Sequence, residues 1–255
     1  GVAGGFARHR PELGAMFEQA WAAVGMGCPT SYVSDLEVAF ASGTTEPDGT
    51  VLIAGTGAAA ARIVGRHVVV TADGHGWLLG DDGSGFWLGR EAARATLRTL
   101  DAGKEPGPLA GAVLAELVGA GADARRPDPV AQRVQLIHAV NARAPVKLAE
   151  LAPLVGVAHR AGDPEAVRIV EEAARLLLQT LRGVRETGES GPIVLAGSVA
   201  GEESPVGAAL RTGVDQRFSG PVCSAADGVG GAAWLALATL EGTATDEAWS
   251  RLTQR

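Results

Sequence analysis

The sequence predicts an α/β protein in which a small antiparallel meander is followed by helices that alternate with strands. Three short apolar stretches between Val51 and Ala72 are separated by glycine-containing turns, a pattern typical of hairpin-connected strands. Helical periodicity after Asp163 predicts a long amphipathic helix, and Pro192 to Ala196 predicts a buried strand behind it. At 255 residues the chain can bury a large core as one large domain or two ordinary ones.

Composition and charge exclude several classes of protein. A hydrophobic fraction of 46% with 20% charged residues is typical of a folded globular chain. No apolar run approaches the roughly 20 residues that a membrane helix needs, so we expect a soluble protein. With 29 acidic against 22 basic residues and no basic cluster, a nucleic-acid partner is not expected.

The two cysteines, Cys28 and Cys223, lie far apart and at no metal-ligand spacing. We therefore expect a reducing, cytoplasmic setting without a structural zinc or iron–sulfur site, and a single disulfide stays open. The chain begins with glycine and has neither a charged segment nor an apolar segment of the signal-peptide kind.

The first part of the chain predicts two helices. A proline at its first turn and apolar residues at helical spacing predict a helix over Pro11 to Val24. Tyr32-Val33 reads as a short extended piece. After Ser34-Asp35 a second helix is expected through Leu36 to Ala41.

The meander comes next, with strands expected at Val51 to Ala54, Ala59 to Val64 and His67 to Ala72. Gly55-Thr56-Gly57 and Gly65-Arg66 supply the two turns.

From Phe86 onward the pattern is mainly helical, with breaks at Asp101 to Pro108 and at Arg125 to Pro129. The long helix is the clearest element, because Asp163 is a natural N-cap, Pro164 suits the first helical position and the apolar face continues to Leu181.

The last part alternates between strands and helices. After the strand from Pro192 to Ala196 we expect a helix at Pro205 to Leu210, a short strand at Pro221-Val222 and a final helix at Gly231 to Leu240.

The stretch around Gly55-Thr56-Gly57 has two interpretations. It fits the loose G-x-G-x-x-A pattern of a dinucleotide-binding turn, with Asp73 downstream as a possible ribose-binding acid. However, only seven residues separate Gly57 from Gly65, too few for the crossover helix that a parallel sheet requires. No Gly-Lys-Ser/Thr follows either, so a hairpin is favoured over both nucleotide-binding loops.

A glycine turn between antiparallel strands can still bind phosphate. Consecutive backbone N–H groups form an anion-binding concavity, Thr56 adds a hydroxyl, and Gly55 and Gly57 allow close approach. Taken alone, the turn is better explained as a plain hairpin turn that needs glycine only for its dihedral angles.

The segment Asp73 to Gly85 contains five glycines, three acids, a histidine and a tryptophan. Such a loop costs much backbone entropy, which favours a binding site. Carboxylates beside an aromatic ring suit a sugar, since the acids accept hydrogen bonds from hydroxyls and the ring covers C–H groups. A solvated Asp-Gly turn is the alternative.

Asp35 is the third feature. Phosphorylation of a sugar needs a carboxylate that orients the attacking hydroxyl and takes its proton. The alternative role of Asp35 is to cap the helix that begins at Leu36, and the two roles are compatible.

Together these residues resemble the N-acetylglucosamine kinase / BadF-BadG-BcrA-BcrD ATPase family of the actin–hexokinase–Hsp70 superfamily. The resemblance runs from Gly1-Val2-Ala3-Gly4 to Gly230-Gly231-Ala232-Ala233, and its most specific part is the segment Gly76 to Gly85, which is similar to the family's G-W-x-L-G-D-E-G-S-G.

The resemblance implies an actin-like ATPase (ribonuclease H-like) α/β fold with two lobes, the second complete and the first truncated. Residues 1–45 would be a remnant of the first lobe and 46–241 the second lobe, with a helical insertion at about 101–160. Residues 242–255 would form a C-terminal tail.

The resemblance also implies roles for individual residues, with ATP and Mg²⁺ as cofactors and no metal ligand assigned in this chain. Asp35 would be the catalytic base. The remaining residues would bind ATP (Gly55, Thr56, Gly57, and Gly197 and Ser198 on the adenosine side) or the sugar (His75, Gly76, Trp77, Asp81 and Asp82).

The chain also departs from the family pattern. Asp82 stands where relatives usually have Glu, and His75 where they often have Trp. Nothing in the chain resembles the Asp-Gly-Gly-x-Thr turn that holds the first phosphate and magnesium, so we expect a fragment. Its unpaired edges would need cover from a second chain, a rearrangement or the missing segment, and we expect a homodimer.

Two functions from different classes follow. One is an ATP-dependent kinase for an amino sugar of the N-acetylglucosamine or glucosamine type, and the other is a non-catalytic sugar-binding or sensor protein on the same fold. An activator of acyl-CoA dehydratases is disfavoured, because Cys28 and Cys223 are not placed to hold an iron–sulfur cluster.

Overall fold

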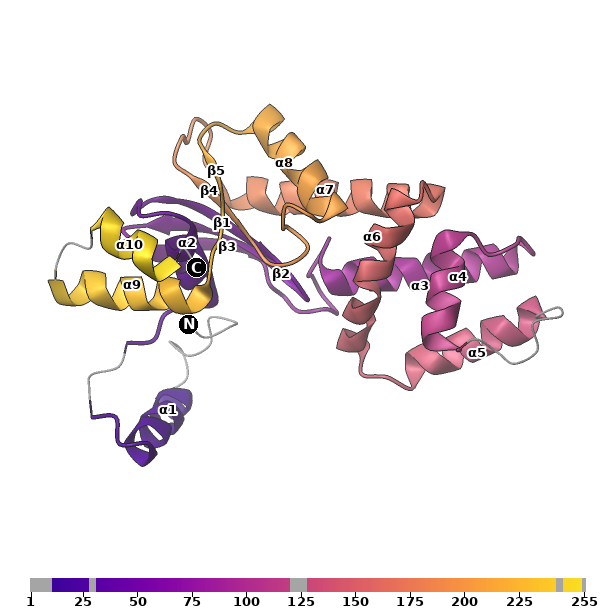
Figure 1. Cartoon of the computed structure of the whole chain (residues 1–255), viewed down its shortest axis with the longest axis horizontal. Coiled ribbons are helices and arrows are strands. Elements are labelled where there is room, and N and C mark those ends of the chain that lie inside the picture. Colours follow the sequence, from indigo (N-terminus) through magenta and orange to yellow (C-terminus); the bar gives the residue numbers. More distant parts are fainter. Residues whose placement is uncertain (1–10, 28–30, 120–127, 242–244, 254–255) are drawn as a thin grey trace.

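The computed structural model describes residues 11–27, 31–119, 128–241 and 245–253, and in that part of the chain a single five-stranded sheet has the order β3-β2-β1-β4-β5 (Figure 1). The meander is confirmed: β1 (Gly49–Ala54), β2 (Ala58–Val64) and β3 (His67–Asp73) pair antiparallel. The strands β4 (Ile193–Ala196) and β5 (Val222–Ser224) extend the sheet parallel to β1.

Side chains of β1 point alternately to the two faces of the sheet. Leu52 and Ala54 face a large core, whereas Val51 faces a small one with Phe40 and Val194. Both faces are therefore covered, which explains why β1 and β4 read as continuous apolar runs and lack the polar alternation of an exposed strand.

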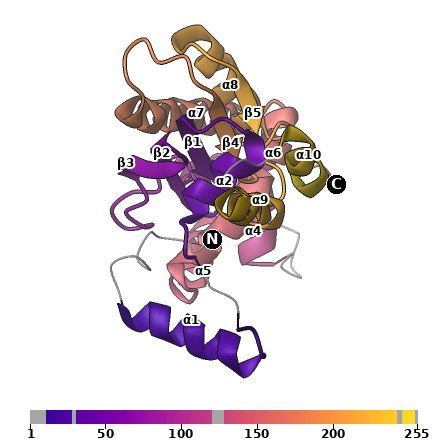
Figure 2. The same ribbon diagram turned by 90° about the vertical axis from the view of Figure 1, so that its left-hand side faces the viewer.

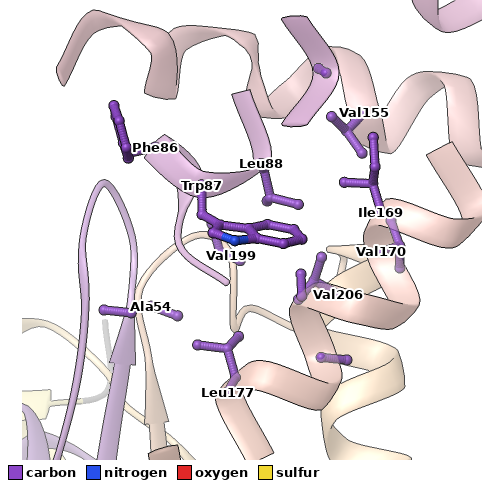
Figure 3. Close-up of a cluster of buried hydrophobic side chains, with 14 of the residues drawn as sticks. Ala54, Phe86, Trp87, Leu88, Val155, Ile169, Val170, Leu177, Val199 and Val206 are labelled. Carbon is purple, nitrogen blue, oxygen red and sulfur yellow. The ribbon is translucent and has the colours of Figure 1, made fainter. Parts of the chain in front are cut away.

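The large core lies between the sheet and a group of helices that extends to one end of the molecule (Figure 1). Figure 3 shows the indole of Trp87 at the centre of this core, between Leu88, Val199 and Val206. The segments around it are α3 (Gly85–Asp101), α4 (Pro108–Leu117), α5 (Pro129–Asn141), a 3₁₀ helix (Pro145–Leu151), α6 (Ala152–Arg160), α7 (Pro164–Val184) and α8 (Pro205–Arg217).

Asp163 determines where α7 begins. As predicted it is the N-cap, and its Oδ1 accepts hydrogen bonds from the N–H groups of Glu165 and Ala166 at 3.0 and 3.1 Å. Its Oδ2 also accepts a hydrogen bond from Leu109 N in α4 at 3.0 Å. One buried carboxylate thus caps the long helix and fixes it to a neighbouring one.

The opposite face of the sheet is covered by α2 (Asp35–Gly43), which packs against α9 (Gly228–Glu241). The helix α10 (Asp246–Thr253) packs on α9, and Trp249 Nε1 donates a hydrogen bond to Ala41 O at 2.7 Å. The segment expected as a tail therefore contains a helix that contacts α2.

Helix α1 (Pro11–Ala23) lies apart from the sheet and its covering helices in both views (Figures 1 and 2). The ring of Phe17 on α1 lies near that of Tyr32, with centroids 5.5 Å apart. No described helix is both long and apolar enough to cross a membrane.

Some local predictions need correction. Helices α8 and α9 are longer than predicted, and α10 was not predicted. Cys28, Gly1-Val2-Ala3-Gly4 and most of the break before Pro129 lie outside the described residues. The division into lobe remnant, second lobe, insertion and tail stays a prediction.

Candidate functional site

The carboxyl ends of β1 and β4 lie side by side because these strands are parallel, and two loops meet there. The turn Gly55-Thr56-Gly57 leads from β1 directly into strand β2, as predicted, and not into a crossover helix. The loop after β4 is joined to it, since Val199 N donates a hydrogen bond to Ala54 O at 2.9 Å.

Gly197 makes this junction possible. Its φ is +90°, and a Cβ at this position would collide with the carbonyl group of Ala54. Only glycine tolerates both conditions, so the loop after β4 can approach the end of β1. This explains why the sequence carries glycine where β4 ends.

The glycine-rich segment is bonded to the β1–β2 turn. Gly85 N donates to Gly55 O at 2.7 Å, and Phe86 N donates to Thr56 O at 3.1 Å. Asp81 Oδ1 accepts a hydrogen bond from Ala58 N at 3.1 Å. The two motifs that the sequence singled out are thus parts of one structure.

Asp73 holds the segment in its folded shape. Its Oδ1 accepts a hydrogen bond from Asp81 N at 2.7 Å and its Oδ2 one from Asp82 N at 3.0 Å. Asp73 and Asp81 both have positive φ, at 62° and 58°, which side chains other than glycine adopt rarely. Such backbone strain, held by hydrogen bonds, is typical of functional loops.

Burial raises the pKa of the Asp81 carboxyl above its ordinary value. The hydrogen bond from Ala58 N opposes this shift, while the charges of Asp73 and Asp82 add to it. Asp81 is therefore both a member of the acidic segment and the anchor of the turn.

A cavity of about 400 Å³, here called the turn cavity, lies against Gly55 and Thr56. Two helices begin at its wall: α3, whose N-cap is Ser84, and α8, whose N-cap is Ser204. Helix N-termini carry partial positive charge, so the cavity favours an anion, although Gly85 N and Phe86 N of α3 already donate hydrogen bonds to the turn. Its other lining residues include Ser198, Val199, Glu203 and, from α6, Gly156 and Arg160.

A second cavity, of about 680 Å³, contains Asp35 and is here called the Asp35 cavity. Ile53 of β1, Ala196 and Gly197 form its wall at the sheet, and Asp227 lies at the start of α9. Gly197 and Ser198 are consecutive, yet one lines the Asp35 cavity and the other the turn cavity. The two cavities therefore lie next to each other at the loop after β4.

Asp35 is the first residue of α2, but it is not the cap. Ser34 is the N-cap, with its Oγ accepting from Glu37 N at 3.1 Å, while Glu37 Oε2 accepts from Ser34 N at 2.7 Å. The alternative role proposed for Asp35 from sequence is thus wrong, because this capping box satisfies the helix end. The pattern S-x-x-E was readable in the sequence.

Glu37 also fixes the position of α2 on the sheet. Its side chain is fully buried, and Oε1 accepts a hydrogen bond from Val68 N at 3.2 Å and lies 3.3 Å from His67 Nδ1. The start of α2, and with it Asp35, is therefore tied to β3.

The other predicted sugar-binding residues lie in the loop between β3 and α3. Trp77 is 40% exposed, with its ring centroid 5.7 Å from that of Phe86. His75 Nδ1 lies 3.9 Å from Asp73 Oδ1, and Asp82 is exposed. His75, Gly76, Trp77 and Asp82 line neither the turn cavity nor the Asp35 cavity, so their role stays a prediction.

Sequence reasoning did not identify Arg160, Glu203 or Asp227 as lining residues. Arg160 comes from α6, far from the recognised motifs, whereas Glu203 and Asp227 lie close to recognised residues in the loops before α8 and α9. Within the described residues no group of three or more His, Cys, Asp or Glu side chains could hold a metal ion. Cys223 is a free thiol whose pKa is raised by burial.

The sheet, its two covering layers and the loops at the ends of β1 and β4 are those of an actin-like ATPase fold, as predicted. The chain belongs to the BadF/BadG/BcrA/BcrD ATPase family, whose model matches residues 11–236. Membership implies the use of ATP. The family resemblance drawn from the sequence motifs is confirmed.

Individual relatives agree with this assignment. The chain is 30% identical over 156 residues to an N-acetylmuramic acid/N-acetylglucosamine kinase from Clostridium acetobutylicum, a match that covers 60% of this chain and 47% of that protein. The chain thus spans about half the length of this relative.

Two solved structures are similar to this chain. A candidate N-acetylglucosamine kinase from Chromobacterium violaceum matches with a TM-score of 0.60 and 28% identity, over 80% of this chain and 67% of the other. A second, from Porphyromonas gingivalis, matches with a TM-score of 0.59 and 22% identity, over 91% and 74%, and supports the fold alone.

Proposed function

We propose that this chain carries part or all of an ATP-dependent kinase that phosphorylates a hydroxyl of an amino sugar of the N-acetylglucosamine or glucosamine type. One observation carries the proposal: the consecutive residues Gly197 and Ser198 line the Asp35 cavity and the turn cavity, respectively, so the two cavities are neighbours. A kinase needs such adjacency, because the phosphates must lie next to the base that activates the hydroxyl.

The turn cavity would hold the nucleotide. Its phosphates would lie against Gly55, Thr56 and Gly57, where the N-termini of α3 and α8 favour negative charge. Gly197 and Ser198 would contact the adenosine side. The assignment of the phosphates follows the electrostatics of the cavity, and that of Gly197 and Ser198 follows the family resemblance.

Mg²⁺ belongs to the same proposal. When bound with ATP it usually uses one or two carboxylates together with phosphate oxygens. Asp227 lines the Asp35 cavity, so a carboxylate other than the proposed base is present for this role. The ion would neutralise charge on the phosphates.

Asp35 would act as the base. Its position at the first residue of α2 places its carboxylate at the Asp35 cavity. The acceptor hydroxyl would lie in the Asp35 cavity, with its proton taken by Asp35 as the phosphoryl group leaves the nucleotide.

The sugar would be held by His75, Gly76, Trp77, Asp81 and Asp82 of the loop between β3 and α3. Support for an amino sugar comes from the relative that is named as an N-acetylmuramic acid/N-acetylglucosamine kinase. A homodimer and a cytoplasmic location complete the proposal.

The test is the release of ADP from MgATP in the presence of single hexoses and hexosamines. We expect turnover with an amino sugar and a loss of about 10²- to 10⁴-fold in kcat for Asp35→Asn. Asp215→Asn, at an exposed position of α8, is the matched control and should leave the rate unchanged. Sugar binding without any turnover would contradict the kinase and favour a non-catalytic sugar-binding protein.

A further inference from the structure

A cavity of about 690 Å³ lies beside the C-terminal ends of α7 and α8, two helices that pack against each other (Figures 1 and 2). It is here called the arginine cavity and shares no lining residue with the turn cavity or the Asp35 cavity. Its walls come from α7 (Arg175, Leu178, Gln179, Arg182), from the loop Arg185 to Glu189 and from the end of α8 (Arg217, Phe218, Ser219). A volume of this size suits a small molecule.

The loop after α7 gives the arginine cavity a fixed wall. The side chain of Arg185 is only 1% exposed, and it donates hydrogen bonds to Glu189 Oε1 at 3.3 Å and to Gly191 O at 2.8 Å. Glu186 N also donates to Glu189 Oε2 at 3.1 Å. These hydrogen bonds hold the loop in one shape, as expected of a preformed site.

The carboxylates that line the arginine cavity are already paired. Glu189 forms an ion pair with the buried Arg185, and Glu186 forms one with Arg62 of β2. Neither carboxylate is therefore left to neutralise the other cations of the cavity.

Two arginines of the cavity have no carboxylate partner in the part of the chain that the structure describes. Arg182 makes no hydrogen bond or ion pair there, and Arg217 donates only to neutral oxygens, the carbonyl of Gly213 and the side-chain amide of the preceding residue. Arg175, by contrast, is paired with Glu172 through two hydrogen bonds of 2.7 and 2.8 Å. The uncompensated positive charge thus belongs to one residue from each helix.

The helix dipole explains only part of this arrangement. Arg182 and Arg217 lie in the last turns of α7 and α8, where a cation is favourable. Arg217 donates to a carbonyl of its own helix, but Arg182 donates to none. Two cations at one cavity also repel each other, and an anion bound between them would remove that repulsion.

We infer that the arginine cavity binds a small phosphate monoester, with the phosphate held by Arg182 and Arg217 and the organic part against Leu178 and Phe218. The planar fork of a guanidinium matches phosphate oxygens in a bidentate manner, and a monoester offers three such oxygens with nearly two negative charges. The two partly buried apolar side chains line the same cavity and supply a surface for the rest of the molecule. This site is separate from the proposed catalytic cavities and does not depend on the proposed function.

Calorimetry with phenyl phosphate, inorganic phosphate and benzoate tests the inference. We expect phenyl phosphate to bind most tightly, because inorganic phosphate lacks the ring and benzoate lacks the second charge. Arg182→Gln and Arg217→Gln should each weaken the binding of phenyl phosphate by at least about 10-fold, since each removes charge-assisted hydrogen bonds. Arg182→Lys, which keeps the charge without the fork, should lose less.

Arg168→Gln is the matched control, because Arg168 is an exposed arginine of α7 that does not line the arginine cavity. Its binding of phenyl phosphate should equal that of wild type. Arg182 is likewise exposed, so Arg182→Gln should keep the melting temperature of the free protein, and its lost binding would not reflect unfolding.

Four results would overturn the inference. The first is no heat of binding for wild type at millimolar phenyl phosphate, and the second is unchanged affinity in both Arg182→Gln and Arg217→Gln. The third is displacement of phenyl phosphate by MgADP, which would place the ligand in the turn cavity. The fourth is benzoate that binds as tightly as phenyl phosphate, which would contradict the assignment to a phosphate. None of these results bears on the kinase assay, so the two proposals fail separately.

Discussion

The carboxylate of Asp81 lies directly beneath the β1–β2 turn, where its Oδ1 accepts a hydrogen bond from Ala58 N at 3.1 Å. A Cβ on Gly57 would come within 2.9 Å of the same oxygen, so the glycine leaves room for the carboxylate. A residue read from sequence as a sugar ligand thus also determines the shape of the turn. The sugar loop and the proposed phosphate turn are coupled through this contact.

Asp81→Ala should destabilise the protein by about 1 to 3 kcal/mol, because the buried N–H of Ala58 loses its acceptor. Asp82→Ala is the neighbouring control. Asp82 is exposed and its side chain makes no hydrogen bond within the described structure, so its replacement should change the free energy of unfolding by less than about 0.5 kcal/mol. Urea denaturation measures both, and equal losses would contradict the anchoring role of Asp81.

The pKa of Asp81 predicts a pH dependence. Burial raises this pKa in the folded protein above the ordinary value of 3.8, so the folded state binds more protons than the unfolded chain just above that pH. The contribution of Asp81 to stability therefore falls as the pH rises through 3.8 toward the raised folded pKa.

Asp81→Asn does not titrate and should gain stability relative to wild type across this window. Urea midpoints of the two proteins, compared from about pH 3 to about pH 7, check the sign, because the other carboxylates titrate alike in both. If the urea midpoint of Asp81→Asn instead falls relative to that of wild type as the pH rises, the pKa of Asp81 is lowered by folding.

Gly197→Ala should cost at least about 1 to 3 kcal/mol, since φ is +90° there and the added Cβ meets the carbonyl of Ala54. Nucleotide affinity should fall as well, because the junction of the two cavities is displaced. Gly201→Ala provides the comparison in the same loop, where a Cβ would make an ordinary contact of 3.4 Å with Ser198 O. Thermal unfolding measures the stability of both variants. Equal stability would mean that a side chain at position 197 causes no strain.

Asp35 and Ser34 should separate catalysis from helix capping. Ser34→Ala removes the cap of α2 and should cost about 0.5 to 2 kcal/mol, whereas Asp35→Asn should leave stability within about 0.5 kcal/mol of wild type. Asp35→Asn should lower the kinase activity of the folded protein much more than Ser34→Ala does. A large loss of melting temperature in Asp35→Asn with full activity would remove Asp35 from the mechanism.

Much of the fold could be predicted from local sequence because its elements are marked locally. The three meander strands follow short apolar runs divided by glycine turns, and α7 follows its N-cap Asp163 and Pro164. The parallel pairing of β1 with β4 could not be predicted, because it depends on contacts between segments distant in sequence. Helix α10 was missed because its main contacts are with α9 and Ala41.

The candidate site divides in the same way. The turn at Gly55 and the acidic segment could be recognised from composition, but the hydrogen bonds from Gly85 and Phe86 that join them needed coordinates. The cavity wall formed by Arg160 carries no sequence signal, since a cation in the last turn of a helix is common. Residues such as Arg160, which reach the cavity wall only because their helix packs there, therefore cannot be identified from the sequence.

Arg185 lies at the opposite end of strands β1 and β4 from the proposed site, and its contacts there are structural. Its side chain is buried at the end of α7 and donates hydrogen bonds to Thr50 Oγ1 and Glu189 Oε1 at 3.0 and 3.3 Å, and to the carbonyls of Gly191 and Ser219. These contacts connect α7 to the starts of β1 and β4. The arginine cavity opens beside them, at the end of the sheet remote from Asp35.

Arg185→Met should destabilise the protein by about 3 to 5 kcal/mol, because several buried acceptors lose their donor at once. Arg182→Met, one turn earlier on the exposed side of α7, removes the same charge and should have little effect. Because the proposed site lies at the other end of β1, whatever fraction of Arg185→Met remains folded should bind nucleotide with wild-type affinity. Weakened nucleotide binding in that folded fraction would mean that the contacts of Arg185 are coupled to the proposed site through β1 and β4.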